Sequence, residues 1–485
     1  MTPRAGSIRR GSALGLVLAA VTGLATLGVG LASRGRQPPH PSSWDPRVRE
    51  VVRFVETAKG RPFRHPVTVS FLADSAFLGR LRQDDQPSAQ DRADNAWRSA
   101  SLRALGLAQG EFDLLASTRA ALGTGVFGFY DPDADQMMIR GDQLTATARS
   151  TLAHELTHAW QDQWYGLNRH FASSEEQAGW TALVEGDATY VGELYSAVAL
   201  SAAEQAASAA VTANVTDQYK DLPPVIIASL GFPYQFGLTY VIGRRATTDF
   251  LAVKPTAATV TALDRAFANP PESSKAVLEG GESSKPVPPI QVRPVAVPRL
   301  QAGEQWLDTD TLGAYALFLA VDQRLGYARA RPLLDAWATD SLLVYRRGTT
   351  VCTRTHIRAG DDRGGAILQS TMQAWAKGIN TRSVSINGRR DVMVQSCDPG
   401  PKVTAAAAPD TLDGSTLLNV EQLLAQRGNT VPGAGANVTA AARKAIICAL
   451  SSKPRDVEGL LSPAVAAMAQ LVRQTGPLTC PPAGP

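Results

Sequence analysis

One run of residues, 142–165, constrains the fold of this chain more than any other stretch. It holds no Pro or Gly, and apolar residues recur every four positions from Leu144, so we expect an amphipathic helix. Within the run the sequence reads His-Glu-Leu-Thr-His, with the histidines at positions 154 and 158. Side chains four residues apart lie on one face of a helix. The spacing therefore predicts a metal site whose first two ligands are His154 and His158.

The acidic residue between the two histidines has a different role. Glu155 lies one position around the helix from His154, where it can reach a water held by the same cation, which makes it the candidate general base. The alternative is a polar helix that happens to hold two histidines. The chain has only six His, and a chance H-E-x-x-H is roughly a one per cent event or rarer at ordinary residue frequencies. The helical context favours the metal interpretation.

A catalytic zinc needs a third protein ligand and an open position for water. The glutamates that follow the histidine helix most closely are Glu175, Glu176, Glu185 and Glu193. The first two lie among Ser and Gln, where a solvated surface role is expected. Glu185 follows two apolar residues and precedes Gly186, within a second expected helix over residues 178–191. Because a buried carboxylate needs a partner or a metal, Glu185 is the predicted third ligand.

Three further residues are candidates for supporting roles. Asp187 points away from the face of Glu185, so we expect it to brace the helix or a ligand histidine. Asp162 lies four residues after His158 and is a second candidate of the same kind. Tyr234 is a candidate donor to an oxyanion, which a zinc hydrolase needs. The alternative for Tyr234 is the usual fate of a tyrosine, a place in the core.

These motifs resemble a known family. H-E-L-T-H-A-W-Q-D-Q followed by A-L-V-E-G-D-A-T-Y resembles the gluzincin metallopeptidases, in which a glutamate on a second helix is the third zinc ligand. G-F-Y-D-P, F-P-Y-x-x-G and N-P-P-x-S-S are similar to a poorly characterised bacterial group of predicted membrane-anchored gluzincins. The resemblance covers roughly residues 44–400. It implies a zincin-like fold and a Zn²⁺ cofactor, with His154, His158 and Glu185 as ligands and Glu155 as base.

The implied reaction is hydrolysis of a peptide or protein substrate. Zn²⁺ would lower the pKa of its water toward about 7 and polarise the scissile carbonyl, and Glu155 would carry the proton to the leaving amine. One position departs from thermolysin-like enzymes: Thr189 stands where they have an aspartate that supports a histidine. Two other functions stay open, a catalytically silent binding or chaperone-like envelope protein and a zinc amidase acting on cell-wall material.

A hairpin is expected just before the histidine helix, with strands at 125–131 and 136–140 around a turn at 132–135. In zincins the strand before this helix is often the sheet edge that pairs with an extended peptide. We therefore expect the edge strand near Val126 and Phe129 to hold the substrate. An ordinary core hairpin is the alternative.

The N-terminal 36 residues are expected to place the protein at a membrane. Residues 13–32 carry no charge and are long enough to span a bilayer. Flanking arginines favour a cytoplasmic N-terminus, so we expect a single-pass signal anchor with the bulk of the chain extracytoplasmic; cleavage after Ala32 would instead give a secreted protein. The first 36 residues contain five arginines and no other charged residue, whereas the formal net charge of the whole chain is only +4. Residues 37–485 are therefore nearly neutral, which argues against nucleic acid as a partner.

The cysteines agree with this location. All four lie in the last third of the chain, and an even count in an exported protein indicates disulfides. We expect local pairing, Cys352 with Cys397 and Cys448 with Cys480. No C-x-x-C spacing occurs, so a second zinc site at these cysteines is not expected.

The expected fold class is α+β and mainly helical. A zincin-like domain with a small edge sheet is followed by a smaller α+β unit and a helical tail. The expected segments are an anchor at 1–36, the zincin-like domain at 44–282, a Pro-rich linker at 283–299, the accessory α+β unit at 300–400, a second linker at 401–415 and a small disulfide-containing tail at 416–485.

Overall fold

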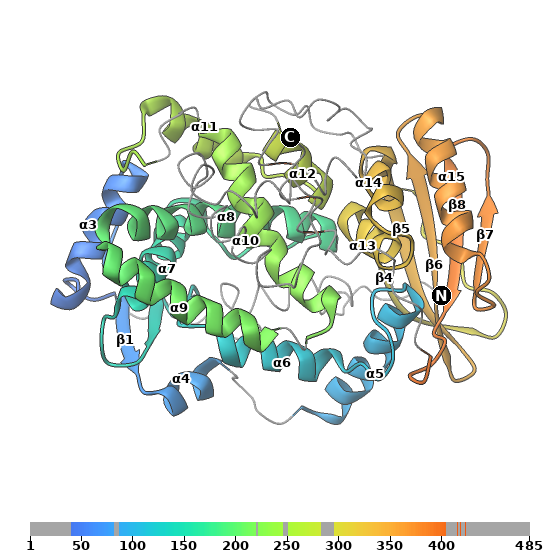
Figure 1. Cartoon of the computed structure of the whole chain (residues 1–485), viewed down its shortest axis with the longest axis horizontal. Coiled ribbons are helices and arrows are strands. Elements are labelled where there is room, and N and C mark those ends of the chain that lie inside the picture. Colours follow the sequence, from blue (N-terminus) through green and yellow to red (C-terminus); the bar gives the residue numbers. More distant parts are fainter. Residues whose placement is uncertain are drawn as a thin grey trace, which may run out of the picture.

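The computed structural model describes residues 40–81, 87–219, 222–245, 251–282 and 295–403, together with Ser415, Leu418 and Gln422. The expected anchor with its apolar run 13–32, nearly all of the tail, most of both linkers, and the pairing of Cys448 with Cys480 lie outside these residues. The described part is α+β and mostly helical, as expected, with small sheets. Figure 1 places a five-stranded sheet at one end, with most of the helices beside it.

The smaller sheet has three strands in the order β1-β3-β2. They are β1 (Thr68–Leu72), β2 (Gly128–Asp131) and β3 (Gln136–Arg140). β1 is parallel to β3 and β2 is antiparallel to it, so β2 is an edge strand, as expected. Its first residue is Gly128, three positions later than expected, because the preceding helix runs through Gly125.

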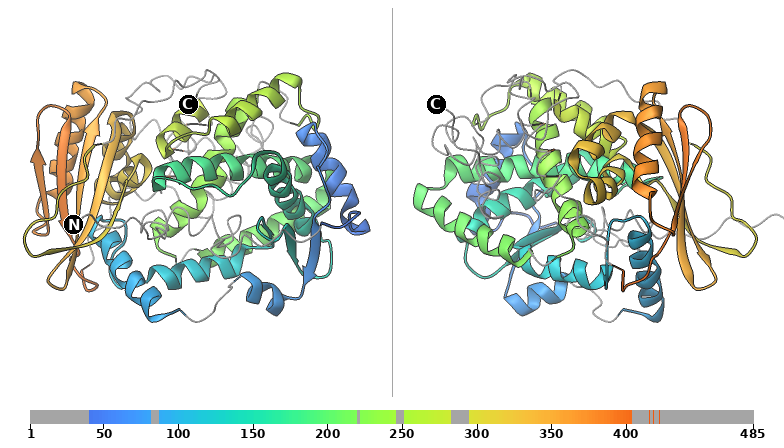
Figure 2. Two further views of the ribbon diagram at one scale, coloured as in Figure 1. Left: turned by 180° about the vertical axis from the view of Figure 1, so that it is seen from behind. Right: turned by 45° about the vertical axis from the view of Figure 1, so that its right-hand side comes forward.

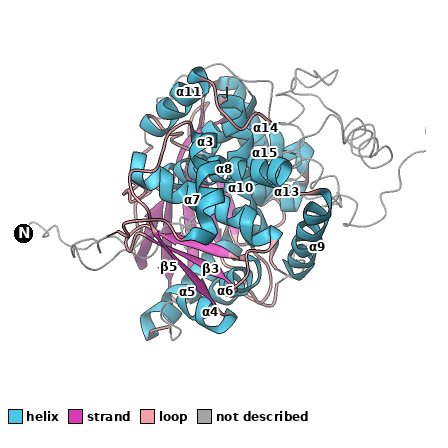
Figure 3. Cartoon of the chain, turned by 90° about the vertical axis from the view of Figure 1, so that its left-hand side faces the viewer, coloured by secondary structure: helices cyan, strands magenta, loops and turns pink. Residues whose placement is uncertain are grey.

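Three long helices pack in succession on this sheet: the first lies against the sheet, the second against the first, and the third against the second. They are α7 (Ala146–Tyr165), α8 (Ser174–Ala199) and α10 (Pro224–Arg244). The hydroxyl oxygen of Thr145 accepts from the backbone N–H of Ala148 (3.2 Å) and caps the start of α7, and the left-handed Gly166 ends it. α7 packs against β2 and β3 on one side and α8 on the other (Figure 3). Among the described residues, α10 alone has the length and composition of a membrane span, and two thirds of its most apolar stretch is buried inside the protein.

The remaining helices surround this centre and reach the five-stranded sheet, as the two views in Figure 2 show. They are η1 (Pro46–Val48), α3 (Arg49–Lys59), α4 (Asp74–Leu81), α5 (Ala89–Ala104), α6 (Leu114–Gly125), α9 (Ala202–Tyr219), α11 (Ala257–Ala268), α12 (Ser274–Glu282), α13 (Ala314–Leu325), α14 (Tyr327–Ala336) and α15 (Asp362–Ala376).

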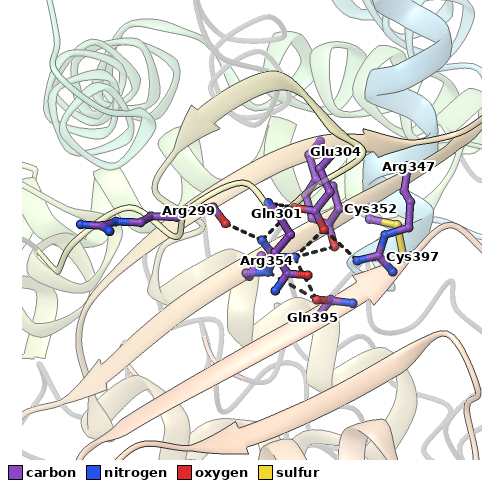
Figure 4. Close-up of polar contacts among 9 residues, drawn as sticks. Arg299, Gln301, Glu304, Arg347, Cys352, Arg354, Gln395 and Cys397 are labelled. Atoms are coloured by element: carbon purple, nitrogen blue, oxygen red, sulfur yellow. Dashed lines mark hydrogen bonds and ion pairs between the residues drawn. A yellow bond between two sulfur atoms is a disulfide. The ribbon is translucent and has the colours of Figure 1, made fainter.

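The larger sheet is antiparallel, in the order β4-β5-β6-β8-β7. Its strands are β4 (Glu304–Asp310), β5 (Trp337–Arg347), β6 (Thr350–Ala359), β7 (Arg382–Ile386) and β8 (Asp391–Cys397). A disulfide joins Cys352 to Cys397 across β6 and β8, which confirms the expected local pairing. Beside it, Arg354 of β6 binds Glu304 of β4 and the backbone carbonyl of Arg299 (Figure 4). These contacts fasten the edge strand β4 and its lead-in segment to the sheet.

One hydrophobic core runs through both the expected zincin-like domain and the expected accessory unit. Tyr315 of α13 joins them, because the centroid of its ring lies 4.6 Å from that of Phe232 and 5.5 Å from that of Phe236, both on α10. The division of the chain into these two units stays a prediction. Their apolar side chains are buried together.

Candidate metal centre

Helices α7 and α8 bring the three predicted ligands together. Nε2 of His154 lies 3.2 Å from Oε2 of Glu185, and Nε2 of His158 lies 3.4 Å from the same oxygen. The two imidazole Nε2 atoms are 3.0 Å apart. All three residues therefore present a ligand atom to one point, within 4.8 Å of one another, an arrangement that could hold a metal ion.

The cluster is buried, so its polar groups need a partner such as a cation. The side chains of His158 and Glu185 are fully buried, while that of His154 is 16% exposed and marks the open side. Oε1 of Glu185 is buried and accepts no hydrogen bond from the described residues. A buried carboxylate oxygen without a partner is costly, so the donor set fits a bound cation.

The charges within the cluster reinforce one another. Burial opposes ionisation of Glu185, but the adjacent His158 and His154 hold its pKa down at about 2. Burial also opposes protonation of His158, yet Glu185 raises its pKa to about 9. Burial lowers the pKa of His154. The carboxylate thus stays ionised, as a metal ligand must be.

Hydrogen bonds fix the orientation of His158. The amide nitrogen of Gln161 donates to the carbonyl oxygen of Val184 (3.0 Å) and to Oδ2 of Asp187 (2.8 Å). Its amide oxygen therefore accepts from Nδ1 of His158 (2.9 Å), which leaves Nε2 of that ring free to face the cluster. The carboxylate of Asp187 is held in turn by the buried ammonium of Lys59. Asp187 thus braces a ligand histidine through Gln161.

Glu155 lies beside the cluster and faces the edge strand. Its Oε2 accepts from the backbone N–H of Tyr130 in β2 (3.0 Å). Burial, together with the negative charge of Glu185, raises the pKa of Glu155 to about 8, against the opposing effects of His158 and the Tyr130 N–H. A carboxyl group with a pKa near neutrality is suited to take up and release a proton.

The edge of β2 that does not pair with β3 lies at the same place. The backbone N–H of Arg140 in β3 donates to the carbonyl of Phe127 (2.9 Å). In the antiparallel register that follows, the backbone groups of Gly128 and Tyr130 point away from β3. The Tyr130 N–H is the group that holds Glu155. An edge strand and the candidate base are therefore joined directly.

The aromatic ring of Tyr234 also lies at the cluster. It is half-buried on α10, and its centroid is 6.0 Å from that of the His154 imidazole, with the rings inclined by 30°. Tyr234 thus comes from a third helix to the open side of the site.

Two of the other carboxylates differ from the sequence expectations. Asp162 does not reach a ligand histidine; it accepts from the hydroxyl of Tyr130 (3.1 Å) and the backbone N–H of Leu167 (2.8 Å), which closes the end of α7. Glu175 is buried rather than solvated, because it accepts from the backbone and hydroxyl of Ser274. That partner lies far along the chain, so local polarity gave no sign of it.

The last two carboxylates do not belong to the described cluster. Glu176 is half-buried and accepts from the backbone N–H of Ala172 (2.8 Å). Glu193 has an exposed side chain on α8. Among the described carboxylates, Glu185 alone joins the two histidines in a group that could hold a metal ion.

The supporting residues Gln161 and Lys59 were not predicted. Gln161 carries a weak signal, since it lies three residues after His158 on the same helix. Lys59 carries none. Comparison of the chain with known protein families, with curated proteins and with solved structures gave no match.

Proposed function

We propose that this protein is a zinc-dependent peptidase with a zincin fold of the gluzincin type. The observation that carries the proposal is the joint placement of His154, His158 and Glu185, with Glu155 beside them. Two imidazoles and one carboxylate form a ligand set used by catalytic zinc, and that set leaves a fourth position open. The orphaned Oε1 of Glu185 supports a bound cation.

The chain's own groups then divide the work of hydrolysis. Zinc held at these residues would supply Lewis acidity and lower the pKa of a coordinated water. Glu155 accepts the proton that the attacking water loses and delivers it to the leaving amine. Tyr234, at the open side beside His154, donates to the oxygen on which negative charge develops.

The substrate in this proposal is an extended peptide. A peptide added as a strand pairs with backbone groups that an edge strand leaves unpaired. In β2 the backbone groups of Gly128 and Tyr130 point away from β3, and Glu155 now accepts from one of them, the Tyr130 N–H, which a peptide strand would take over. Strand addition here brings a backbone carbonyl of the peptide close to the base.

The proposed location is extracytoplasmic and membrane-anchored. The charge-free run at 13–32 supports an N-terminal anchor. The disulfide between Cys352 and Cys397 supports an oxidising compartment, because such bonds are rare in the cytosol.

Glu155→Gln tests the enzymatic role. The change keeps the shape of the side chain and touches neither histidine, but it removes the proton acceptor. Hydrolysis of a quenched fluorescent casein should fall by about 10²-fold or more, the usual scale for a lost general base, while zinc content stays unchanged.

Glu176→Gln is the matched control, since it removes a carboxylate outside the cluster, and its activity should equal that of the wild type. Full activity in Glu155→Gln would contradict the role of the base. A zinc-loaded wild-type chain that cleaves no peptide would contradict the peptidase assignment as a whole.

A further inference from the structure

A cavity of about 470 Å³ lies at the end of the molecule that carries the five-stranded sheet. It is bounded by the end of α5 and the loop after it, by the C-terminal end of α13, and by the turn between α15 and β7. None of its lining residues belongs to the candidate metal centre. The proposed peptidase activity therefore makes no use of it.

The charged side chains that line the cavity are all positive. Arg103, Arg324 and Arg382 line it, and no Asp or Glu is among the described residues that line it. Arg103 is neutralised by a two-pronged contact with Asp398 (2.9 and 2.7 Å). Neither of the other two forms an ion pair with any described carboxylate.

The remaining two guanidinium groups are held in place by neutral partners. Nη2 of Arg324 donates to the backbone carbonyl of Lys377 (2.8 Å), and its Nε is buried with no partner among the described residues. The Cζ atom of Arg382 lies over the ring of Trp375, 3.5 Å from its centroid, and Nη1 of Arg382 donates to the carbonyl of the same residue (3.2 Å). Burial, and then the nearby charge of Arg324, lower the pKa of Arg382 to about 10. The fold thus holds two like charges near each other, with no counter-ion for either among the described residues.

Such an arrangement favours the binding of an anion. Guanidinium groups bind carboxylate and phosphate oxygens through charge-assisted hydrogen bonds, often two at a time. The other walls are mixed: Gln323, Asn380 and Thr381 supply neutral polar groups, and Ala320 and Ile379 supply apolar surface. A ligand that matches the cavity has a charged head and an apolar body.

We propose that this cavity binds a small organic anion. Its carboxylate or phosphate head group is held by Arg324 and Arg382, and its apolar body lies against Ala320 and Ile379. The site is separate from the candidate metal centre and does not depend on the proposed function.

Calorimetric titration of the full chain tests the proposal. The probes are benzoate, phenyl phosphate and benzamide, the last being a neutral analogue of benzoate with nearly the same shape. The protein is stripped of metal and dialysed first, so that binding at the metal centre does not contribute. At least one anion should bind about tenfold or more tightly than benzamide, the scale of a charge-assisted hydrogen bond, and the tighter anion identifies the head group.

Substitutions locate the site. Arg324→Gln and Arg382→Gln should each weaken binding of that anion by about tenfold or more. Arg324→Lys should give an intermediate loss, because it keeps the charge and loses the planar fork. Arg389→Gln is the control and should bind as the wild type does, since Arg389 is exposed and pairs with Asp362 at the surface.

Thermal unfolding without probe shows which variants are folded. Equal affinity for benzoate, phenyl phosphate and benzamide would overturn the proposal. So would wild-type affinity for the anion in folded Arg324→Gln and Arg382→Gln, or no binding of either anion.

Discussion

The single side chain that most shapes the candidate centre after its ligands is Gln161. It connects His158 to Asp187, which the buried Lys59 binds directly, so His158, a predicted ligand on α7, is oriented by α8 and α3. Partners of this kind fix the tautomer and direction of a ligand histidine. The ligand geometry is thus set by a chain of contacts rather than by the H-E-x-x-H turn alone.

Replacing Gln161 by Leu should weaken zinc binding. The change keeps the size of the side chain but removes the acceptor for Nδ1 of His158, so the ring is free to turn. We expect the zinc dissociation constant to rise by about 10- to 100-fold, measured by competition with a chromogenic chelator. Gln163→Leu is the control, because Gln163 is on the same helix and bonds to the 64–65 segment instead. Equal losses in both variants would show a general effect on α7.

At this scale the sequence predicted which three residues come together in the cluster, and it missed the residues that support them. His154, His158 and Glu155 follow from helical spacing within five residues, which is local information. The choice of Glu185 needed only its apolar neighbours. Gln161 and Lys59 depend on contacts between three helices, and Glu175 on a contact with Ser274, so neither local polarity nor periodicity could reveal them.

Among the elements, the contact between α8 and α10 holds the site in shape. A Cβ atom at Gly186 would overlap the backbone of Gly237, and one at Gly237 would overlap the carbonyl of Ala182. The two helices therefore touch backbone to backbone, next to Glu185. This closeness lets α10 bring Tyr234 to the open side of the cluster.

Gly186→Ala should consequently be destabilising, although alanine favours helix in general. The added methyl group forces α8 and α10 apart, and we expect a loss of about 1–3 kcal/mol of unfolding free energy, the usual range for overpacking. Chemical denaturation measures it. Gly79→Ala, in helix α4 with open space around its Cβ position, is the control and should be neutral or stabilising by up to about 1 kcal/mol. A neutral Gly186→Ala would refute the close contact.

The order of these elements could be read from the sequence, and their lengths less well. The hairpin strand at 136–140 and the helix that follows were expected, because turn residues and helical periodicity mark them. α8 runs from Ser174 to Ala199, well beyond the expected 178–191. Its N-terminal extension packs against distant segments near Ser274 and Asp310, and such contacts have no local signature.

Across the whole molecule, two buried carboxylates lie where the two expected units meet: a Cβ atom at Gly313 would overlap the carboxylate of Glu175, and the charge of Asp340 acts on the same group. Glu175 at the start of α8 accepts from the N–H and hydroxyl of Ser274 at the start of α12 (3.0 and 2.9 Å). Asp340 of β5 accepts from the backbone N–H groups of Leu312 and Gly313 before α13 (2.6 and 2.8 Å). Helix N-termini favour such acceptors. The junction therefore depends on acids that are out of water.

This junction should make stability depend on pH. Burial, together with the nearby Asp340 and Asp310, raises the pKa of Glu175 to about 8, against the opposing hydrogen bonds from Ser274. In the unfolded chain the carboxyl group has a pKa of about 4.3. Between about pH 4.3 and about pH 8 the folded state therefore keeps a proton that the unfolded chain has lost. The contribution of Glu175 to stability therefore falls as pH rises through this window.

Glu175→Gln should flatten that dependence, because an amide does not titrate and still accepts from Ser274. Thermal midpoints at about pH 5 and about pH 8 should differ less in this variant than in the wild type. Glu176→Gln, one position along and half-buried, should keep the wild-type difference. If Glu175→Gln and the wild type lose the same number of degrees, Glu175 is not the titrating group.

The most direct test of the central claim is the zinc content of the full chain. We expect about one zinc per wild-type chain after exhaustive dialysis, measured by elemental analysis, since three protein ligands hold a catalytic zinc. Glu185→Ala should lose the zinc, because it removes one of those ligands, while Glu193→Ala should retain it, because that carboxylate is exposed on the same helix. Full zinc occupancy in Glu185→Ala, or no zinc in the wild type, would contradict the account.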